Sequence, residues 1–473
     1  TMRTGGGLSH PAAVRILGIS VHWFYQIPAA IDLARRAREA GFRGFVVMGG
    51  FTSSLYAREI LRRHAEVDGV VRGDGERPML ELAKRAEGRG GRLERVPNLV
   101  WRRRGKIEAN RFDYTAREQD LDALDFGRLD TIRNLRAHFA ASSWREITDG
   151  SRSAGADLSA TFYLCGGRGC SVACASCGGG RAAQRSHSRR KRVIFRSPDR
   201  LADDVQLAAS LGATSMHACF DPAPNGPHWH AFMDAIGRVG LRLPMIFESF
   251  GLPDGRFLRR FAETFPGGIM VITADSADES VRRRVRGFPF SNADLVEALD
   301  LASSLGVLVQ LYLGYFAPFE GISGLYASRR WAREIARRYG GAVEVLHYPM
   351  STDPGSPISR NPARWSMACD LKTLADYERE LSRQEPWLGN LLRHHPAGST
   401  ALEVGAATGA VELEQSLARE EPAMHARRER RLGPRFDPFF TTLARRVLSA
   451  GVISGLDRRK LHRLVLEDVR GGA

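Results

Sequence analysis

The sequence predicts an α/β protein in which a doubly wound, Rossmann-like domain precedes a partial (β/α)6 barrel and a helical C-terminal region. Three observations support this fold class. Short apolar runs alternate with helical stretches over residues 14–88 and again over 161–350, which is the pattern of parallel βα units. Glycine, serine and proline stand where these stretches begin and end. No apolar run reaches the roughly 18 residues that a membrane-spanning helix needs.

Residues 1–111 are expected to form the doubly wound domain. Apolar runs predict strands at 14–21, 45–51 and 67–76, and the stretches after them predict helices at 28–41, 53–64 and 78–88. Two extended runs around Arg104-Gly105 predict a hairpin over 98–111 that closes the domain. Residues 112–158 are polar and mixed in character, so we expect a linker with some helix.

Residues 159–350 are expected to form the barrel, and residues 351–473 a mostly helical domain. The barrel strands are expected at 161–165, 214–221, 243–251, 268–276, 307–316 and 342–350. The helices are expected at 198–212, 228–240, 254–265, 291–306 and 326–340, with Ser291 as a candidate N-cap. Catalytic groups of β/α barrels lie at the C-terminal ends of the strands. The loop after the first strand therefore occupies a catalytic position.

The chain is basic, with 69 Lys+Arg against 53 Asp+Glu and a net charge of +16. Its one dense basic run, residues 185–192, lacks the interleaved aromatics that a platform for stacking bases requires. We therefore expect no nucleic-acid partner and a solvated face, with docking of an acidic flavodoxin-type reductant as the alternative. The N-terminus lacks the apolar core of a signal peptide, so we expect a cytoplasmic protein without a membrane partner.

Four of the six cysteines fall within thirteen residues, at Cys165, Cys170, Cys174 and Cys177. Clustered cysteines in a cytoplasmic protein bind metal or do redox chemistry more often than they form disulfides. Structural zinc usually requires a second pair of ligands, which is missing here. A four-thiolate iron–sulfur cluster would need Cys165, whereas a three-thiolate [4Fe-4S] cluster leaves one iron open. The remaining cysteines, Cys219 and Cys369, are expected to be core thiols, with a hydrogen-donor role as the alternative for Cys219.

The CxxxCxxC spacing of Cys170, Cys174 and Cys177, in the loop after the first barrel strand, resembles the signature of the radical S-adenosylmethionine (radical SAM) enzymes. The resemblance implies that these cysteines hold a [4Fe-4S] cluster whose open iron chelates SAM. It implies reductive cleavage of SAM to a 5′-deoxyadenosyl radical, which abstracts hydrogen from the substrate. It also implies a flavodoxin- or ferredoxin-type electron donor. The alternative of a different class is a zinc- or RNA-binding module.

The same resemblance suggests SAM contacts. The residues are Gly178, Gly179, Gly180, Glu248, Ser249, Asp275 and Ser276. The glycines would leave room beside the cluster. Asp275-Ser276 stands where the family usually has Glu-Ser, and Glu248-Ser249 ends the third strand. A capping or turn role is the alternative for each. Ser176 replaces an aromatic that the family commonly has near the adenine.

The segments "ILGIS" (16–20), "VVMGG" (46–50) and "VDGVVRGDGERPMLEL" (67–82) resemble the second half of the cobalamin-binding domain of B12-type radical SAM enzymes. "DPGSP" (353–357) resembles a C-terminal segment of the same group. A complete domain has two further βα units, and about 14 residues precede "ILGIS". We therefore expect a truncated domain with a three-stranded sheet that does not hold cobalamin.

Without cobalamin, the radical would act on the substrate directly and give dehydration, epimerisation, oxidation or rearrangement. The alternative is a cobalamin-dependent C-methyltransferase. His217, Asp221, Glu248, Asp275 and Tyr312 are expected near strand ends, with His347 and Tyr348 as further pocket residues. So many polar groups suit a small hydroxylated or amino-bearing metabolite, as in aminoglycoside or sugar natural-product biosynthesis. His228 and His230 are not expected to bind metal.

Overall fold

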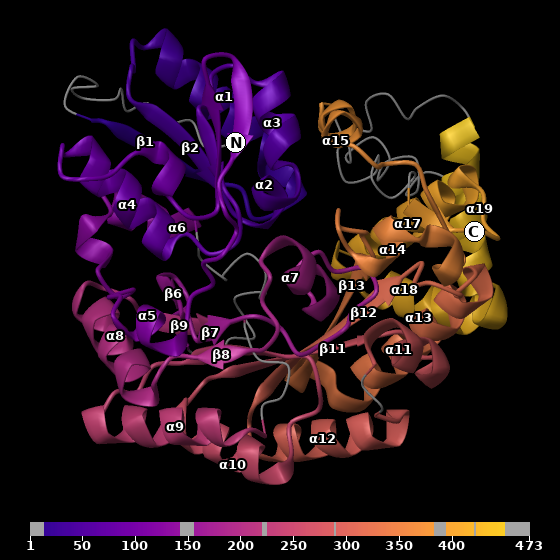
Figure 1. Ribbon diagram of the computed structural model, residues 1–473. Helices are drawn as coiled ribbons and strands as arrows, with labels where there is room; N and C mark the ends of the chain where they lie inside the picture. Colours follow the sequence, from indigo (N-terminus) through magenta and orange to yellow (C-terminus); the bar gives the residue numbers. More distant parts are fainter. Residues whose placement is uncertain are drawn as a thin grey trace.

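The computed structural model describes residues 14–141, 156–219, 225–287, 290–382, 394–420 and 422–449. Two sheets carry most of the strands in these ranges, one of five strands and one of six (Figure 1). The five-stranded sheet belongs to the N-terminal part, and the six-stranded sheet follows it in the chain. The alternation of strands and helices that the sequence indicates is therefore present in both parts.

The N-terminal sheet has the strand order β1-β2-β3-β4-β5. Its strands are β1 Ile16–Ser20, β2 Phe45–Gly49, β3 Gly69–Val71, β4 Leu99–Arg103 and β5 Lys106–Ala109. The first three are parallel, as expected, but β4 pairs antiparallel with β3. The expectation of a three-stranded sheet is therefore wrong, because the hairpin over 98–111 extends the sheet.

Helices cover both faces of this sheet, which makes it doubly wound. They are α1 Ile27–Glu39, α2 Phe51–Leu55, α3 Ala57–Arg63 and α4 Glu76–Ala86. α1 and α3 pack with Met48 in one apolar cluster, whereas α4 packs with Val47 in another. Neighbouring residues of a strand point to opposite faces, so the two clusters lie on opposite sides. The single helix expected over 53–64 is divided at Tyr56 into α2 and α3.

The second sheet is entirely parallel, with the order β13-β12-β11-β10-β9-β6. Its strands are β6 Thr161–Tyr163, β9 Ser215–Ala218, β10 Met245–Ser249, β11 Ile269–Asp275, β12 Leu308–Tyr315 and β13 Val343–Pro349. Its outer helices are α8 Pro198–Ser210, α9 Pro227–Val239, α10 Gly255–Thr264, α12 Asn292–Ser304 and α13 Ile322–Tyr339. The six expected barrel strands are all present and follow one another in sequence order.

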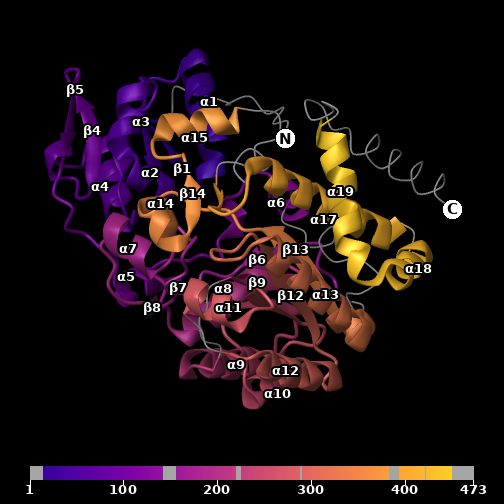
Figure 2. The ribbon, with the colours of Figure 1, turned by 90° about the vertical axis from the view of Figure 1, so that its right-hand side faces the viewer.

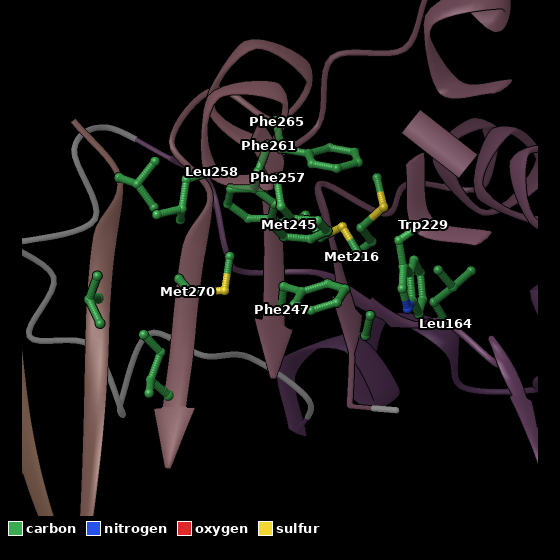
Figure 3. Packing of buried hydrophobic residues seen from close by; sticks show 14 of the residues in the cluster. Leu164, Met216, Trp229, Met245, Phe247, Phe257, Leu258, Phe261, Phe265 and Met270 are labelled. Carbon is green, nitrogen blue, oxygen red and sulfur yellow. The ribbon is translucent and has the colours of Figure 1, made fainter. Parts of the chain in front are cut away.

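One face of the barrel sheet packs against these helices through a large apolar core. Phe257 and Phe261 of α10 lie beside Phe247 of β10 and Met270 of β11 (Figure 3). Because side chains alternate along a strand, the neighbours of these residues point into the barrel. The polar side chains at the strand ends can therefore face an interior that the helices do not fill.

Residues 112–141 form an ordered connection that packs on the barrel. They contain α5 Glu118–Asp122 and α6 Leu135–Ala141. Arg196, which is buried, pairs with Asp204 and donates a hydrogen bond to the carbonyl of Leu124 at 2.8 Å. This part of the expected linker is thus fixed against α8.

The described part of the C-terminal region combines helices with a short sheet. Its elements are α14 Pro357–Arg360, β14 Met367–Cys369, α15 Leu374–Leu381, β15 His394–Pro396, α17 Ala401–Glu420, α18 Pro422–Leu432 and α19 Phe436–Ser449. α15 returns to the N-terminal domain, where Tyr377 packs near Phe24 (Figure 2). α19 docks on α13 through Arg329, which donates to Asp437 at 2.9 Å. No helix among the described residues is long and apolar enough to cross a membrane.

Candidate active site

The three clustered cysteines lie on the loop that follows β6, the first barrel strand. A small antiparallel ribbon, β7 Gly167–Arg168 and β8 Ile194–Phe195, brackets this loop and the following helix α7 Arg181–His187. The loop therefore begins and ends on one scaffold and stands at the C-terminal edge of the barrel sheet. This is the catalytic position that the sequence predicts.

Two further elements fix the backbone of the cysteine loop. Ala175 donates its N–H to Val285 of α11 (Glu279–Arg286) at 2.8 Å, and its carbonyl accepts from Ile358 at 3.0 Å. Asp353 donates its N–H to Ser176 at 2.9 Å, and its carboxylate accepts from Gly178 N–H at 2.9 Å. The "DPGSP" segment thus holds the cysteine loop in place, a role that its sequence alone did not indicate.

Each of the three thiols has a hydrogen-bond donor beside it. Val172 N–H lies 3.4 Å from Cys170 Sγ, and Gly179 N–H lies 3.2 Å from Cys177 Sγ. Arg286 places its guanidinium 3.8 Å from Cys174 Sγ. Burial raises the pKa of all three thiols, that of Cys174 to about 11, while Arg286 acts in the opposite direction on Cys170 and Cys174. Donors of this kind stabilise a thiolate once a metal binds it.

The arrangement fits an iron–sulfur cluster better than a single zinc ion. Cys170, Cys174 and Cys177 are free thiols that form no disulfide. Among the described residues, no three His, Cys, Asp or Glu side chains could hold one metal ion together. A cluster does not require this, because each thiolate bonds a different iron. Cys165 follows β6 and is half-buried; burial raises its pKa, and Arg168 and Arg196 oppose this shift.

Two of the predicted site residues meet at one buried ion pair next to the cluster loop. Asp275, fully buried at the end of β11, pairs with Arg286 through both carboxylate oxygens. Tyr348 of β13 donates its hydroxyl to the same carboxylate. Since Arg286 also contacts Cys174, a continuous chain of polar contacts runs from Tyr348 to Cys174. Arg286 was not predicted, because only the folded chain brings it to Asp275.

A second polar group lies on the inner face of the barrel. His217 of β9 and Glu248 of β10 are joined at 2.8 Å between Nε2 and Oε1. Burial, together with the nearby carboxylates of Glu248 and Glu344, raises the pKa of Tyr312 of β12 to about 12. The Tyr312 and Tyr348 rings are 6.0 Å apart. The structure thus brings four of the predicted pocket and SAM residues, His217, Glu248, Tyr312 and Tyr348, to one barrel mouth.

The two predicted serines have partners within the protein. Ser249 donates to the carbonyl of Gly251 at 2.7 Å, which is a turn contact. Ser276 donates to the buried carboxylate of Glu320 at 2.7 Å. A SAM contact for either serine therefore stays a prediction beside an observed structural role.

The glycines after Cys177 fit against other parts of the chain. A Cβ on Gly178 would lie 2.8 Å from Cβ of Asp353, and one on Gly179 would lie 3.1 Å from the Phe51 ring. A Cβ on Gly180 would lie 3.3 Å from the carbonyl of Val172. Protein atoms thus occupy the space beside Gly178 and Gly179 that we expected SAM to need, and the SAM role of the three stays a prediction.

His347 does not belong to the barrel interior, and its prediction as a pocket residue is corrected. Alternation along β13 places it on the face opposite Tyr348. Val343 and Val345, on the same face of β13, pack in the core on the helix side of the sheet. Burial and then Arg329 and Arg333 of α13 lower the pKa of His347 to about 3. Asp221 lies outside the described residues. His228 stacks on Phe195 at 4.2 Å, and His230 contacts Arg260 at 3.2 Å. That neither binds a metal stays a prediction.

The basic run 185–192 is only partly a solvated face. Arg190 is buried and pairs with Asp74 of the N-terminal domain. Arg189 packs over the Phe112 ring and donates to its carbonyl. These contacts join the segment after α7 to the N-terminal domain. The arginines at the centre of the run are therefore structural.

Aromatic side chains fill the space between the N-terminal sheet and the cysteine loop. The His22 and Phe51 rings, just beyond β1 and β2, are 4.2 Å apart, and Phe51 is 4.8 Å from His187 of α7. The cavity that they line with Gly178 and Asp353 has about 10 Å³, which is room for one water molecule. That this part of the molecule does not hold cobalamin stays a prediction.

No family model matches the chain, and no curated protein matches it. Solved structures do resemble it. The radical S-adenosylmethionine methyltransferase TsrM from Kitasatospora setae, with tryptophan substrate and a SAM analogue bound, superposes with a TM-score of 0.59 at 16% identity. That match covers 80% of this chain and 74% of TsrM. A second TsrM structure, with cobalamin and a [4Fe-4S] cluster bound, gives a TM-score of 0.57 at 16% identity, covering 80% and 73%.

The cobalamin-dependent S-adenosylmethionine radical enzyme OxsB, with aqua-cobalamin bound, matches over most of this chain. The TM-score is 0.55 at 14% identity, and the match covers 96% of this chain but 66% of OxsB. At such identities the likeness shows the fold alone. Because structures of both proteins hold cobalamin, the likeness gives no support to our expectation that cobalamin is absent. The chain has the fold of radical SAM enzymes and resembles those of the B12 type.

Proposed function

We propose that this protein is a radical SAM enzyme that removes a hydrogen atom from a small polar substrate held in the barrel mouth. The observation that carries the proposal is the cysteine loop at the end of β6. Its three thiols each have a donor and stand at the catalytic edge of the barrel. A cluster with SAM, when bound, supplies one-electron cleavage of an unreactive sulfonium and a carbon radical strong enough to take hydrogen.

The residues around the loop would divide the remaining work. Cys170, Cys174 and Cys177 would hold the cluster. Arg286 would place its guanidinium beside Cys174, and the Asp275 carboxylate would balance the charge of that guanidinium. The N-terminal domain, through Phe51, and the segment at Asp353 would exclude water from the loop. Exclusion of water protects a reactive radical from side reactions.

The substrate would lie against the inner barrel residues. The pair of His217 and Glu248 can accept or donate a hydrogen bond, and Tyr312 and Tyr348 add hydroxyl groups and ring faces. These groups suit a metabolite with hydroxyl or amino substituents, because a site built of hydrogen-bonding groups rejects analogues that leave them unpaired. We propose dehydration, epimerisation or rearrangement of such a metabolite, as in natural-product biosynthesis.

A second candidate function is cobalamin-dependent C-methylation. The fold likeness to the methyltransferase TsrM favours it. The aromatic packing of His22 and Phe51 on the cysteine loop opposes it, and we derive no step through cobalamin. Titration of the protein with hydroxocobalamin, followed by gel filtration and absorption spectroscopy, separates the two. Stoichiometric retention of the corrin would establish the second candidate.

The cluster itself is tested by anaerobic reconstitution with iron and sulfide. We expect the wild-type protein to gain the broad absorption of a [4Fe-4S] cluster and Cys177→Ala to lose it. The matched control is Cys369→Ala, because Cys369 is a buried cysteine of β14 and not a residue of the cysteine loop. Failure of the wild-type protein to take up iron would overturn the proposed function.

A further inference from the structure

The surface next to the cysteine loop is hollowed into an open cavity with a basic lining. Its volume is about 440 Å³. Ala173, the neighbour of Cys174 in the chain, forms part of its wall, together with Ala182 of α7. The charged residues that line it are Arg284, Arg360 and Arg364, and Trp365 adds an aromatic face. The cavity wall therefore includes the residue next to Cys174, one of the three proposed cluster ligands.

The three arginines keep their positive charge uncompensated. All three are exposed. Arg284 packs over the Phe319 ring at 3.3 Å from its centroid, and Arg360 donates to the Ser186 hydroxyl. Within the described ranges no carboxylate comes within 4 Å of any of the three guanidinium groups, and no acidic residue lines the cavity. Arg190 differs from these three arginines, because its charge is paired with that of Asp74 inside the protein.

Other sides of the cysteine loop are in contact with the protein. Phe51 covers Gly179, the segment at Asp353 covers Ser176 and Gly178, and Val285 of α11 holds Ala175. The wall at Ala173 is the part of the loop that borders the open cavity. A molecule that must come close to the cluster ligands without entering the barrel can approach through this cavity.

We propose that the basic cavity of Arg284, Arg360 and Arg364 is the docking surface for an acidic, low-potential one-electron carrier protein. This inference rests on the proposed function, since a cluster at the cysteine loop must receive its electron from outside. One electron leaves the reduced carrier, which is oxidised by one electron, and enters the cluster, and no atom is transferred. Unpaired arginines around an aromatic side chain are typical of protein interfaces, and their charge steers an acidic partner.

The test uses the reconstituted full chain and a reduced flavodoxin as the acidic probe. The variant Arg360→Glu/Arg364→Glu reverses the charge of the cavity and leaves Arg284 on its ring. The matched control Lys191→Glu/Arg192→Glu reverses two exposed charges of the basic run. We expect the substitutions in the cavity variant to raise the Kd for flavodoxin roughly tenfold at low salt and by a smaller factor at high salt. We expect the control to stay within about twofold, as fits a charge outside the interface.

The rate of SAM consumption provides the second measurement. With flavodoxin as reductant we expect the cavity variant to be slower than wild type, whereas with dithionite the two should be equal, which also shows that the variant is folded.

An unchanged flavodoxin Kd in the cavity variant would overturn the docking proposal and leave the proposed function standing. So would inorganic phosphate binding that the variant loses while flavodoxin binding is kept, because the cavity would then be a small-anion site. Absence of dithionite-driven turnover in wild type would instead contradict the proposed function, and the Kd comparison would still test the docking surface.

Discussion

Asp275 adopts an unusual backbone conformation for a carboxylate residue, with a φ of 61°. It lies where the register between β11 and β12 shifts, so the strand bends and aims the side chain at Arg286 and Tyr348. Positive φ values cost non-glycine residues of the order of 1 kcal/mol, and they persist where other contacts over-determine them. The buried pair with Arg286 provides those contacts.

Replacing Arg286 with methionine is expected to affect both the fold and the cluster. The change leaves the Asp275 carboxylate buried without its cation, which costs about 3 kcal/mol, and it removes the donor beside Cys174. We expect a lower thermal midpoint and less iron retained per chain after reconstitution, with Arg286→Lys intermediate. The control is Arg283→Met on the exposed side of α11. Equal iron content and equal midpoints in the Arg286 and Arg283 variants would contradict this role.

Glu320 should make the stability of the protein depend on pH. It is 3% exposed, and burial raises its pKa from 4.5 to about 7. The folded protein therefore binds the proton more tightly than the unfolded chain does. Stability is full below pH 4.5 and falls as the pH rises to about 7, by about 3 kcal/mol at most.

The measurement is the thermal midpoint at pH 5 and pH 8. We expect Glu320→Gln to lose less stability than wild type over this interval, because its side chain cannot ionise. Glu297→Gln, at an exposed position of α12, is the control and should behave as wild type does. An identical pH dependence in Glu320→Gln and wild type would assign the effect to another group.

At the scale of elements, the periodicity of the sequence predicts which segments are strands and helices but not how they join. All six barrel strands follow from short apolar runs, and Ser291 caps α12 as expected, accepting from Asp294 N–H at 3.0 Å. The hairpin of β4 and β5 was predicted as well. Its pairing with β3 was not, because a hairpin signal is local and does not say which sheet edge will accept it.

The site shows the same division between local and distant information. The CxxxCxxC spacing is enough to predict Cys170, Cys174 and Cys177 as a group, since all three lie on one loop. Arg286 meets Asp275 because α11 follows β11 and folds back, and Tyr348 joins them from two strands away. Whether His347 or Tyr348 faces the interior depends on which face of β13 packs against the outer helices. The packing of the whole strand decides this, and the two residues themselves do not.

The contact between the cysteine loop and the segment of Asp353 predicts that Gly178 tolerates no side chain. A Cβ there would lie 2.8 Å from Asp353 Cβ and 2.9 Å from the Pro354 carbonyl, which is backbone that cannot rotate away. We expect Gly178→Ala to displace this segment, lower the thermal midpoint and slow cluster uptake. Overpacking of this kind costs about 1–3 kcal/mol.

The matched control is Gly237→Ala in the interior of α9, where a Cβ would meet no atom within 4 Å. Alanine is the better helix former, so this variant should be neutral or more stable than wild type by up to about 1 kcal/mol. If Gly178→Ala were as stable as Gly237→Ala, the close contact at Asp353 would not be part of the folded structure.

At the scale of the whole molecule, three parts of the chain meet at the cysteine loop. The N-terminal domain contributes Phe51, the barrel contributes the loop and α11, and the C-terminal region contributes Asp353. α15 then packs back on the N-terminal domain, while α17 and α19 pack on the barrel through α13 (Figure 2). The C-terminal region thus ties the first two parts together around the site.

The release of 5′-deoxyadenosine tests the central claim most directly. The reconstituted protein is reduced with dithionite, supplied with SAM under anaerobic conditions and analysed by chromatography with mass detection. We predict that 5′-deoxyadenosine forms in wild type and in Cys369→Ala and is absent in Cys177→Ala, because only Cys177 belongs to the cysteine loop. A wild-type protein that carries a full cluster, binds SAM and still releases no 5′-deoxyadenosine would contradict the proposed radical chemistry.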